Sequence, residues 1–199
     1  MLGLPKSTEI AKPLPKKAIY DKFDLKAAQR DRFDADISRL TLVNVVSPAT
    51  VPGLLPGDAV TAIYVVDVAL KHSDYDPKNI ALLSNLIPQK MLFILRCDGK
   101  VQLAIHHTKL LCGRWMADGE AMLALSGTTT DAVWEGWVRT IGNIEVAEGN
   151  SLSEQIAIDE ERAKLMHRIV QLEAKARAEK QSHKKVELFQ QLQELKKKL

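Results

Sequence analysis

The sequence predicts an α+β fold. It has a mixed or antiparallel sheet with a central long strand and a hairpin flanked by helices, plus a C-terminal helical hairpin or coiled coil. Three observations predict it. Residues 59–71 contain a long run of Val, Ile and Tyr with a single acid, which suits a buried strand. Residues 91–107 read as two apolar strands around an Asp-Gly turn. From Leu152 onward Gly and Pro are absent, and charged residues, Gln and Leu dominate.

The composition is that of an ordinary globular chain with an appendage. Of 199 residues, 46% are hydrophobic and 27% charged, which suffices for one core. A net charge of +3 is too small to indicate strong capture of nucleic acid. Cys97 and Cys112 are too few for a disulfide framework, and no long apolar segment occurs. We therefore expect reduced thiols, a cytoplasmic location and no membrane partner.

Three regions are expected along the chain. Residues 1–20 are predicted to be an extended basic arm, because Pro5, Pro13 and Pro15 interrupt any helix there. Residues 21–148 are predicted to form the α+β domain. Residues 149–199 are predicted to form a helical, coiled-coil-like tail.

The first half of the predicted domain alternates helix and strand. Residues 26–40 have apolar positions at helical spacing and predict an amphipathic helix. Residues 41–46 are β-branched and predict a short strand, followed by a Pro/Gly loop. Residues 59–71 predict the central strand. Asp76 and Pro77 predict the start of a helix that Pro88 ends.

A hairpin is expected around Asp98 and Gly99, a pair that fits both central positions of a type I′ turn. With a two-residue turn, residues whose numbers add up to 197 lie opposite each other. One face is then apolar, with Leu92, Ile94, Val101, Leu103 and Ile105. The other is mixed and expected to be half covered, with Phe93, Leu95, Gln102, Ala104 and His106.

The end of the domain predicts a weaker hairpin and a helix. Residues 114–127 suggest a second hairpin around Asp118 and Gly119. A helix is expected to start between Thr128 and Asp131. Its apolar stripe would bury two tryptophans against the sheet and consists of Trp134, Trp137, Val138 and Ile141.

The tail contains two leucine-rich stripes with the 4-3-4 spacing of a coiled-coil seam. The first consists of Leu165, Ile169, Leu172 and Ala176, and the second of Leu188, Leu192, Leu195 and Leu199. The two stripes are out of phase, and residues 177–185 between them lack large apolar side chains. We therefore predict two helices folded into an antiparallel hairpin; the alternative is one continuous helix with a stutter.

The stripes also predict an association, because a two-helix hairpin buries little apolar surface by itself. Docking on the chain's own domain, dimerisation and binding of another chain all remain open. The predicted partner-binding residues are Leu165, Ile169, Leu172, Leu188, Leu192, Leu195 and Leu199.

A metal-dependent nuclease is the alternative function. Asp67 and Lys71 on the predicted central strand are the residue types of such a site. Those enzymes place acid and lysine two residues apart, roughly 7 Å, whereas four residues of strand span about 13 Å. No second acid accompanies them. The sequence therefore assigns no catalytic residue outside this alternative reading.

No metal or cofactor site is predicted. Cys97, His106, His107 and Cys112 resemble a ligand set, but the hairpin register separates Cys97 from His106 by almost a strand length. The two histidines are read as strand-end residues. Phosphate-loop, dinucleotide, nucleophile-elbow and zinc-protease motifs are missing from the sequence.

Basic residues suggest a weak contact with nucleic acid. Acidic residues interleave with the basic ones in the tail, so a solvated helix face is the favoured reading. Any binding should be salt-sensitive and independent of base sequence. The candidates are Lys12, Lys16, Lys17, Lys180, Lys184 and Lys185.

The chain resembles the domain-of-unknown-function family DUF4391 of bacteria and archaea. The resemblance rests on LPKSTEIAKPLPKKAIYDKF, AIYVVDVALK, ILRCDGKVQLAIHHTK and KARAEKQSHKKVELFQQLQELKKKL, in this order over nearly the whole chain. It implies a small accessory protein found near helicases and DNA methyltransferases of restriction-type defence systems. It brings no catalytic motif.

The leucine stripes favour a non-catalytic adaptor, and the family resemblance implies that it serves a bacterial DNA-processing or phage-defence system. Its C-terminal helices would bind a helicase, a methyltransferase subunit or a second copy of the chain. The competing expectation is a metal-dependent nuclease-like subunit that acts on DNA through Asp67.

Overall fold

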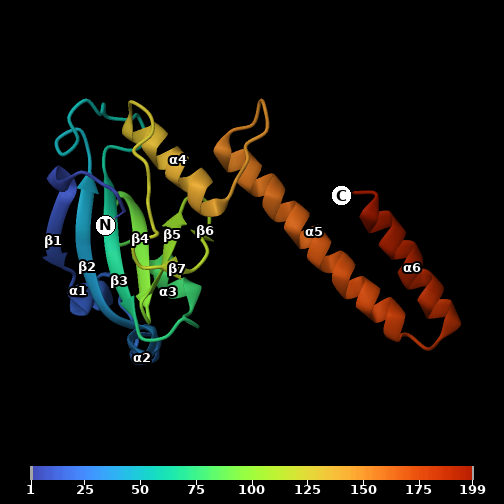
Figure 1. Cartoon of the computed structure of the whole chain (residues 1–199). Coiled ribbons are helices and arrows are strands. Elements are labelled where there is room, and N and C mark those ends of the chain that lie inside the picture. The colour runs from blue at the N-terminus through green and yellow to red at the C-terminus, as the bar shows by residue number, and fades with distance from the viewer. Residues whose placement is uncertain (1, 199) are drawn as a thin grey trace. The chain divides into compact units, whose positions relative to one another are not determined.

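The computed structural model describes residues 2–198 and divides into two compact units, one ending at Glu145 and one beginning at Val146. Figure 1 labels their elements. The first unit contains η1 (Lys6–Thr8), β1 (Glu9–Pro13), α1 (Lys16–Lys22), α2 (Ala27–Asp36), β2 (Ile37–Val46), β3 (Ile63–Leu70), α3 (Pro77–Leu83), β4 (Lys90–Cys97), β5 (Lys100–His106), β6 (Leu110–Cys112), β7 (Met116–Ala117) and α4 (Thr130–Gly142). The second contains α5 (Leu152–Ala178) and α6 (Ser182–Lys196).

The seven strands of the described chain form one mixed sheet, in agreement with the predicted α+β class. The strand order is β1-β2-β3-β4-β5-β6, and β7 pairs with β5. The β3–β4 pair is parallel, because α3 lies between these strands and returns the chain across the sheet. β3 lies inside the sheet between β2 and β4, although β2 is longer, with ten residues against eight.

The predicted β4–β5 hairpin is confirmed together with its register. Leu92 pairs with Ile105, as the two-residue turn requires. Asp98 and Gly99 have φ values of 48° and 72°, which a type I′ turn needs at both central positions. The face that carries Phe93 is covered more than expected, because helices pack on it: Phe93, Leu95 and Ala104 are buried, whereas Gln102 and His106 are half-buried.

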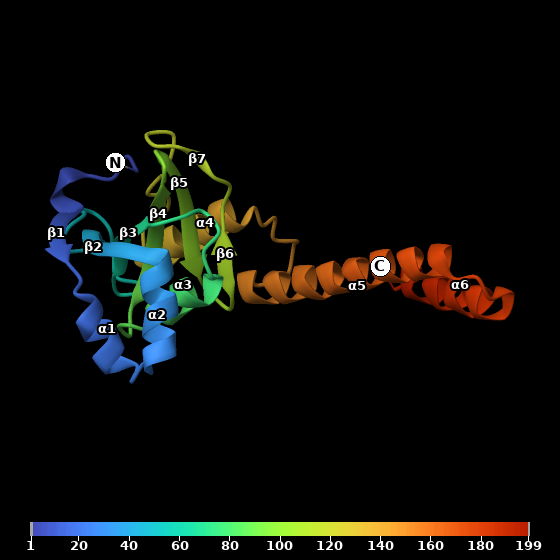
Figure 2. The ribbon, with the colours of Figure 1, turned by 90° about the horizontal axis from the view of Figure 1, so that it is seen from below.

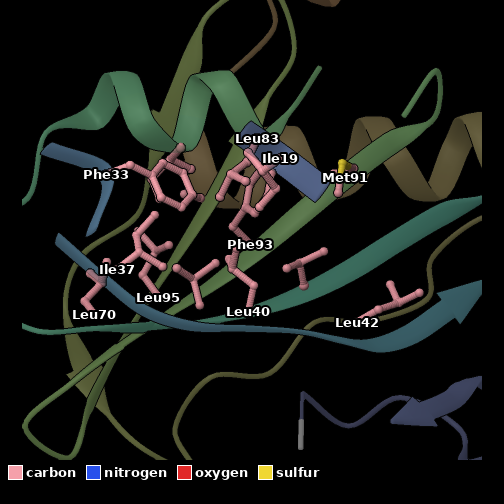
Figure 3. Packing of buried hydrophobic residues seen from close by; sticks show 14 of the residues in the cluster. Ile19, Phe33, Ile37, Leu40, Leu42, Leu70, Leu83, Met91, Phe93 and Leu95 are labelled. Carbon is pink, nitrogen blue, oxygen red and sulfur yellow. The ribbon is translucent and has the colours of Figure 1, made fainter. Parts of the chain in front are cut away.

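The main core lies between this face of the sheet and the helices α1, α2 and α3, which Figure 2 shows together on one side of the strands. Ile19 of α1, Phe33 of α2 and Leu83 of α3 have at most 1% of their surface exposed. Figure 3 shows them gathered above Phe93 and Leu95 of β4. The other strands contribute Ile37, Leu40, Leu42, Val66, Val68, Leu70 and Ala104.

The helix α4 packs on the opposite face of the sheet. Ile105 points away from the main core because neighbouring strand residues alternate between faces, and Ala104 belongs to that core. Leu111 pairs with Ile105 across the neighbouring strands. The Cδ1 atom of Leu111 would lie 3.1 Å from a Cβ placed on Gly142, so α4 packs closely on this face. The predicted stripe of this helix is buried as expected and consists of Trp134, Trp137, Val138 and Ile141.

The N-terminal segment requires a correction, because residues 1–20 were expected to be an extended arm. β1 pairs with β2 at the sheet edge, and α1 places Ile19 in the main core. Pro15 stands at the N-cap of α1, where its missing N–H costs no helical hydrogen bond. The prolines thus separate short elements of the first unit.

In two further segments, strand pairing changes the predicted structure. The helix expected over residues 26–40 ends at Asp36, and residues 37–40 already belong to β2. Residues 114–127 do not form a hairpin of their own: β7 before the Asp118-Gly119 turn pairs with β5 instead. In both segments pairing with a neighbouring strand overrides the local pattern.

The loop before β3 is held by the first turn of α4. One carboxylate oxygen of Asp131 accepts a hydrogen bond from the backbone N–H of Asp58 at 2.8 Å, and the other from that of Val60 at 2.7 Å. A Cβ on Gly57 would lie 2.3 Å from the carboxyl carbon of Asp131. Glycine is therefore needed at position 57 for this close approach.

The second unit is a two-helix hairpin, as predicted, and not the alternative of one continuous helix. Ser151 caps α5, and its side chain and that of Glu154 satisfy each other's backbone N–H groups. The chain leaves helical geometry after Ala178 and re-enters it at Ser182. α6 then returns alongside α5, as Figures 1 and 2 both show.

Candidate functional site

The predicted partner-binding leucines lie where α5 and α6 pack against each other. Ile169 and Leu192 are buried, with 5% and 4% of their surface exposed. The neighbouring positions of both stripes are half-buried, namely Leu165, Leu172, Leu188 and Leu195. Leu199 lies outside the described residues. The two stripes therefore pack against each other.

A second set of apolar side chains remains exposed on this hairpin. Five of the eight strongly exposed large apolar side chains of residues 2–198 belong to α5 and α6. Four of them form two pairs, Met166 with Val170 and Val186 with Phe189, and each residue is 43–57% exposed. Exposed apolar side chains that gather in one place commonly mark a binding surface.

One ion pair shows that Met166 and Phe189, one residue from each pair, lie on the same edge of the hairpin. Lys196 Nζ of α6 lies 2.7 Å from Glu173 Oε1 of α5, so these two positions adjoin. Met166 precedes Glu173 by seven residues, and Phe189 precedes Lys196 by seven, which returns each to nearly the same side of its helix. We define the hairpin edge as Met166, Val170, Val186 and Phe189.

The dimensions of this edge follow from the antiparallel arrangement. Phe189 lies seven residues from the ion pair toward the connection between the helices, and Met166 lies seven residues in the opposite direction. The two apolar pairs are therefore about 14 residues, roughly 21 Å, apart along the hairpin. The edge presents two apolar contacts separated by the Glu173–Lys196 ion pair.

The surroundings of the hairpin edge are basic. Arg177 follows Glu173 by four residues and thus continues the same side of α5, and Lys180 is exposed in the connection just after the helix. Between residues 162 and 198, eleven Lys and Arg residues stand against four Asp and Glu residues. Lys196 lowers the pKa of the Glu173 carboxyl, so this acid stays charged at neutral pH. An acidic apolar surface would complement the edge.

The residues of the nuclease alternative have other partners. The Asp67 carboxylate is hydrogen-bonded to Arg96 Nε, and Arg96 Nη1 also lies 2.7 Å from Asp118 Oδ2. Lys71 is exposed just beyond the end of β3. Although burial opposes the charged guanidinium, its hydrogen bonds to the two acids raise the pKa of Arg96. The carboxylate of Asp67 is thus neutralised by an arginine.

No cluster of three or more His, Cys, Asp or Glu side chains suited to a metal ion occurs within residues 2–198. Cys97 is buried in the main core, and burial raises its pKa. Burial also raises the pKa of Cys112, although its hydrogen bond with Tyr75 acts in the opposite direction. Both cysteines are thiols and not thiolates at neutral pH, so neither is an activated nucleophile.

The basic residues proposed to contact nucleic acid fall into two groups in different units. Lys16 is engaged in the fold, because its ammonium pairs with Asp34 at 2.6 Å and donates to the carbonyl of Ile37. The other five side chains are exposed; they are Lys12 and Lys17 in the first unit and Lys180, Lys184 and Lys185 in the second.

The strand-end histidines line a polar cavity that the sequence analysis missed. The cavity holds about 310 Å³ and lies in the first unit. Its polar lining consists of Ser84, Asn85, Gln89, Lys90, His106 and His107. The hairpin register contained a partial signal for it, because extending the sum of 197 beyond the last pair, Leu92 and Ile105, brings positions 90 and 107 together at the end of the hairpin.

Comparison with known proteins gives one finding. The family described as Domain of unknown function (DUF4391) matches residues 2–199. No curated protein and no solved structure matches the chain. Among the described helices, none combines the length and the apolar character that crossing a membrane would require.

Proposed function

The chain belongs to the family described as Domain of unknown function (DUF4391), and we propose that it is a non-catalytic accessory protein that binds a protein partner through the hairpin edge. The single observation behind this proposal is the exposure of Met166, Val170, Val186 and Phe189 along one side of a hairpin whose leucine seam is already occupied. Within the proposal, the seam leucines hold the two helices together, and the edge makes the contact.

The proposed partner presents an acidic amphipathic helix. Two apolar pairs spaced roughly 21 Å apart match about four turns of a partner helix. Arg177 beside the edge and the excess of basic residues on the hairpin call for acidic residues on that helix. The resemblance to the family leads us to propose that this helix belongs to a helicase or a DNA methyltransferase subunit of a bacterial defence system.

The test is a complex of the full chain with each of these subunits from the same cell. The first variant, Phe189→Glu, places a charge on the edge, and Gln190→Glu is the matched control because it adds the same charge at the neighbouring exposed position. Circular dichroism checks that both variants keep their helices. Affinity co-purification and light scattering then measure the mass of the complex.

We expect a complex of chain and subunit that survives Gln190→Glu and is lost with Phe189→Glu. The proposal fails if no subunit binds, or if the two variants bind equally well. It also fails if light scattering shows that the chain alone is a dimer, and if Phe189→Glu but not Gln190→Glu dissociates this dimer. A second copy of the chain would then occupy the edge.

A further inference from the structure

The cavity beside α4 concentrates groups that can carry positive charge. Lys90 Nζ lies 5.5 Å from the centre of the Trp134 ring, in a cation–π contact. His107 Nδ1 accepts a hydrogen bond from Trp134 Nε1 at 3.1 Å, so its ring proton is carried by Nε2. His106 lines the same cavity from the end of β5.

This cluster has little opposing charge. No Asp or Glu is among the described residues that line the cavity, and Lys90 forms no ion pair with any carboxylate of residues 2–198. Glu135 of α4 acts on His107 from outside the lining and favours its charged form. Burial, followed by the charge of Lys90, lowers the pKa of His106 and of His107. The three groups therefore repel one another when charged.

We propose that this cavity binds a phosphate-type oxyanion, with Lys90 as the main ionic contact, His106 as the proton-dependent contact and His107 as a neutral group of the lining. An anion beside Lys90 and the protonated His106 turns the repulsion between these two groups into attraction. Gln89 adds an amide donor, because its Oε1 accepts from Thr61 Oγ1 and its NH₂ group is left for the ligand. Ser84 and Asn85 contribute less, since both side chains donate to the carbonyl of Ala81.

The volume favours an anion that carries a substituent. About 310 Å³ lies at the lower end of ligand pockets and exceeds the room that an isolated phosphate needs. The phosphate group is the shared chemistry of free phosphate and a phosphomonoester. This site is independent of the hairpin edge, because every residue that lines it belongs to the first unit.

The test follows the imidazole resonances of His106 and His107 by NMR in the full chain. Inorganic phosphate and adenosine 5′-monophosphate are titrated separately, and sulfate is titrated at pH 8 and pH 6 because it stays a dianion over this range. Lys90→Gln removes the ammonium. Lys100→Gln is the matched control, because it removes an exposed lysine at the far end of β5.

We expect saturable shifts of both histidines, tighter sulfate binding at pH 6, and affinity reduced about tenfold or more in Lys90→Gln, as for one charge-assisted contact. Without ligand, the pKa of both histidines should rise in Lys90→Gln, because the repulsion from Lys90 is gone. His106→Gln is a second variant and should weaken the pH dependence.

The two probes distinguish the source of the phosphate group. Tighter binding of the monophosphate supports a phosphomonoester site, and equal or tighter binding of phosphate supports a free oxyanion. The proposal is overturned if neither probe shifts the histidines, or if the shifts are the same in wild type and in Lys90→Gln.

Discussion

The ion-pair cluster of Asp67, Arg96 and Asp118 provides the sharpest stability prediction. Side-chain exposure is 13% for Asp67 and 22% for Arg96, but 55% for Asp118. Replacing Arg96 with Met leaves the Asp67 charge inside the sheet without a partner. A fully buried pair costs about 3–5 kcal/mol to break, and partial exposure reduces this to about 2–3 kcal/mol.

A double-mutant cycle tests this assignment. Arg96→Met and Asp67→Asn should each destabilise the first unit by about 2–3 kcal/mol, whereas the exposed Asp118→Asn should cost less than about 1 kcal/mol. The double variant should lose about 2 kcal/mol less than the sum of the single losses, since both variants remove the same interaction. Urea unfolding followed by the fluorescence of Trp134 and Trp137 measures the free energies.

Additive losses would refute this reasoning, because they would mean that the two side chains do not depend on each other. The same variants bear on the nuclease alternative. Incubation of the wild-type chain with single- and double-stranded DNA and Mg²⁺ or Mn²⁺ should give no cleavage, because Arg96 occupies the Asp67 carboxylate. Cleavage that disappears in Asp67→Ala would instead establish an enzyme.

Three further predictions concern other parts of the chain. Gly57→Ala should destabilise the first unit by about 2 kcal/mol or more in urea unfolding, because the new Cβ would lie 2.3 Å from the carboxyl carbon of Asp131 in α4. Gly136→Ala is the control: its Cβ would point into open space on the same helix, so it should stabilise the unit by up to about 1 kcal/mol. Because the pKa of His106 and of His107 is lowered in the folded state, the unfolded chain binds more protons than the folded chain below pH 6.5. The urea concentration at the unfolding midpoint should therefore decrease as the pH is lowered from 6.5 to 5, and it should stay constant above pH 6.5. A midpoint that is unchanged down to pH 5 would contradict this. Leu192→Asp should reduce the helical circular dichroism of the hairpin, because Leu192 is buried in the seam; unchanged helicity would show that the seam does not hold the hairpin.

The parts of the fold that could be predicted from the sequence are those where local chemistry decides the geometry. Asp98 and Gly99 determine a turn, and the turn determines the register of two strands. The N-terminal segment could not be predicted in this way. β1 exists only because it pairs with β2, and Ile19 is buried only because the sheet and other helices surround α1. Such contacts between distant segments leave no mark in a short window of sequence.

The candidate sites show the same limit in another form. The heptad spacing correctly located an apolar seam, but spacing does not tell whether a seam faces its own chain or a partner. The edge residues Met166 and Phe189 do not belong to either stripe, and only the Glu173–Lys196 ion pair places them on one side. Extending the register could have placed Lys90 and His107 near each other, yet it could not show that Trp134 of α4 contacts both.

The two proposals can be separated because Phe189 and Lys90 lie in different units. Loss of a partner in Phe189→Glu with unchanged phosphate binding assigns partner binding to the hairpin edge and leaves the cavity intact. Loss of both in a single variant would require coupling between the units. If adding phosphate changes partner affinity in the wild-type chain, the same factor must appear when partner is added before phosphate, since coupled binding is reciprocal. Lys90→Gln should then abolish this coupling while it preserves the complex itself.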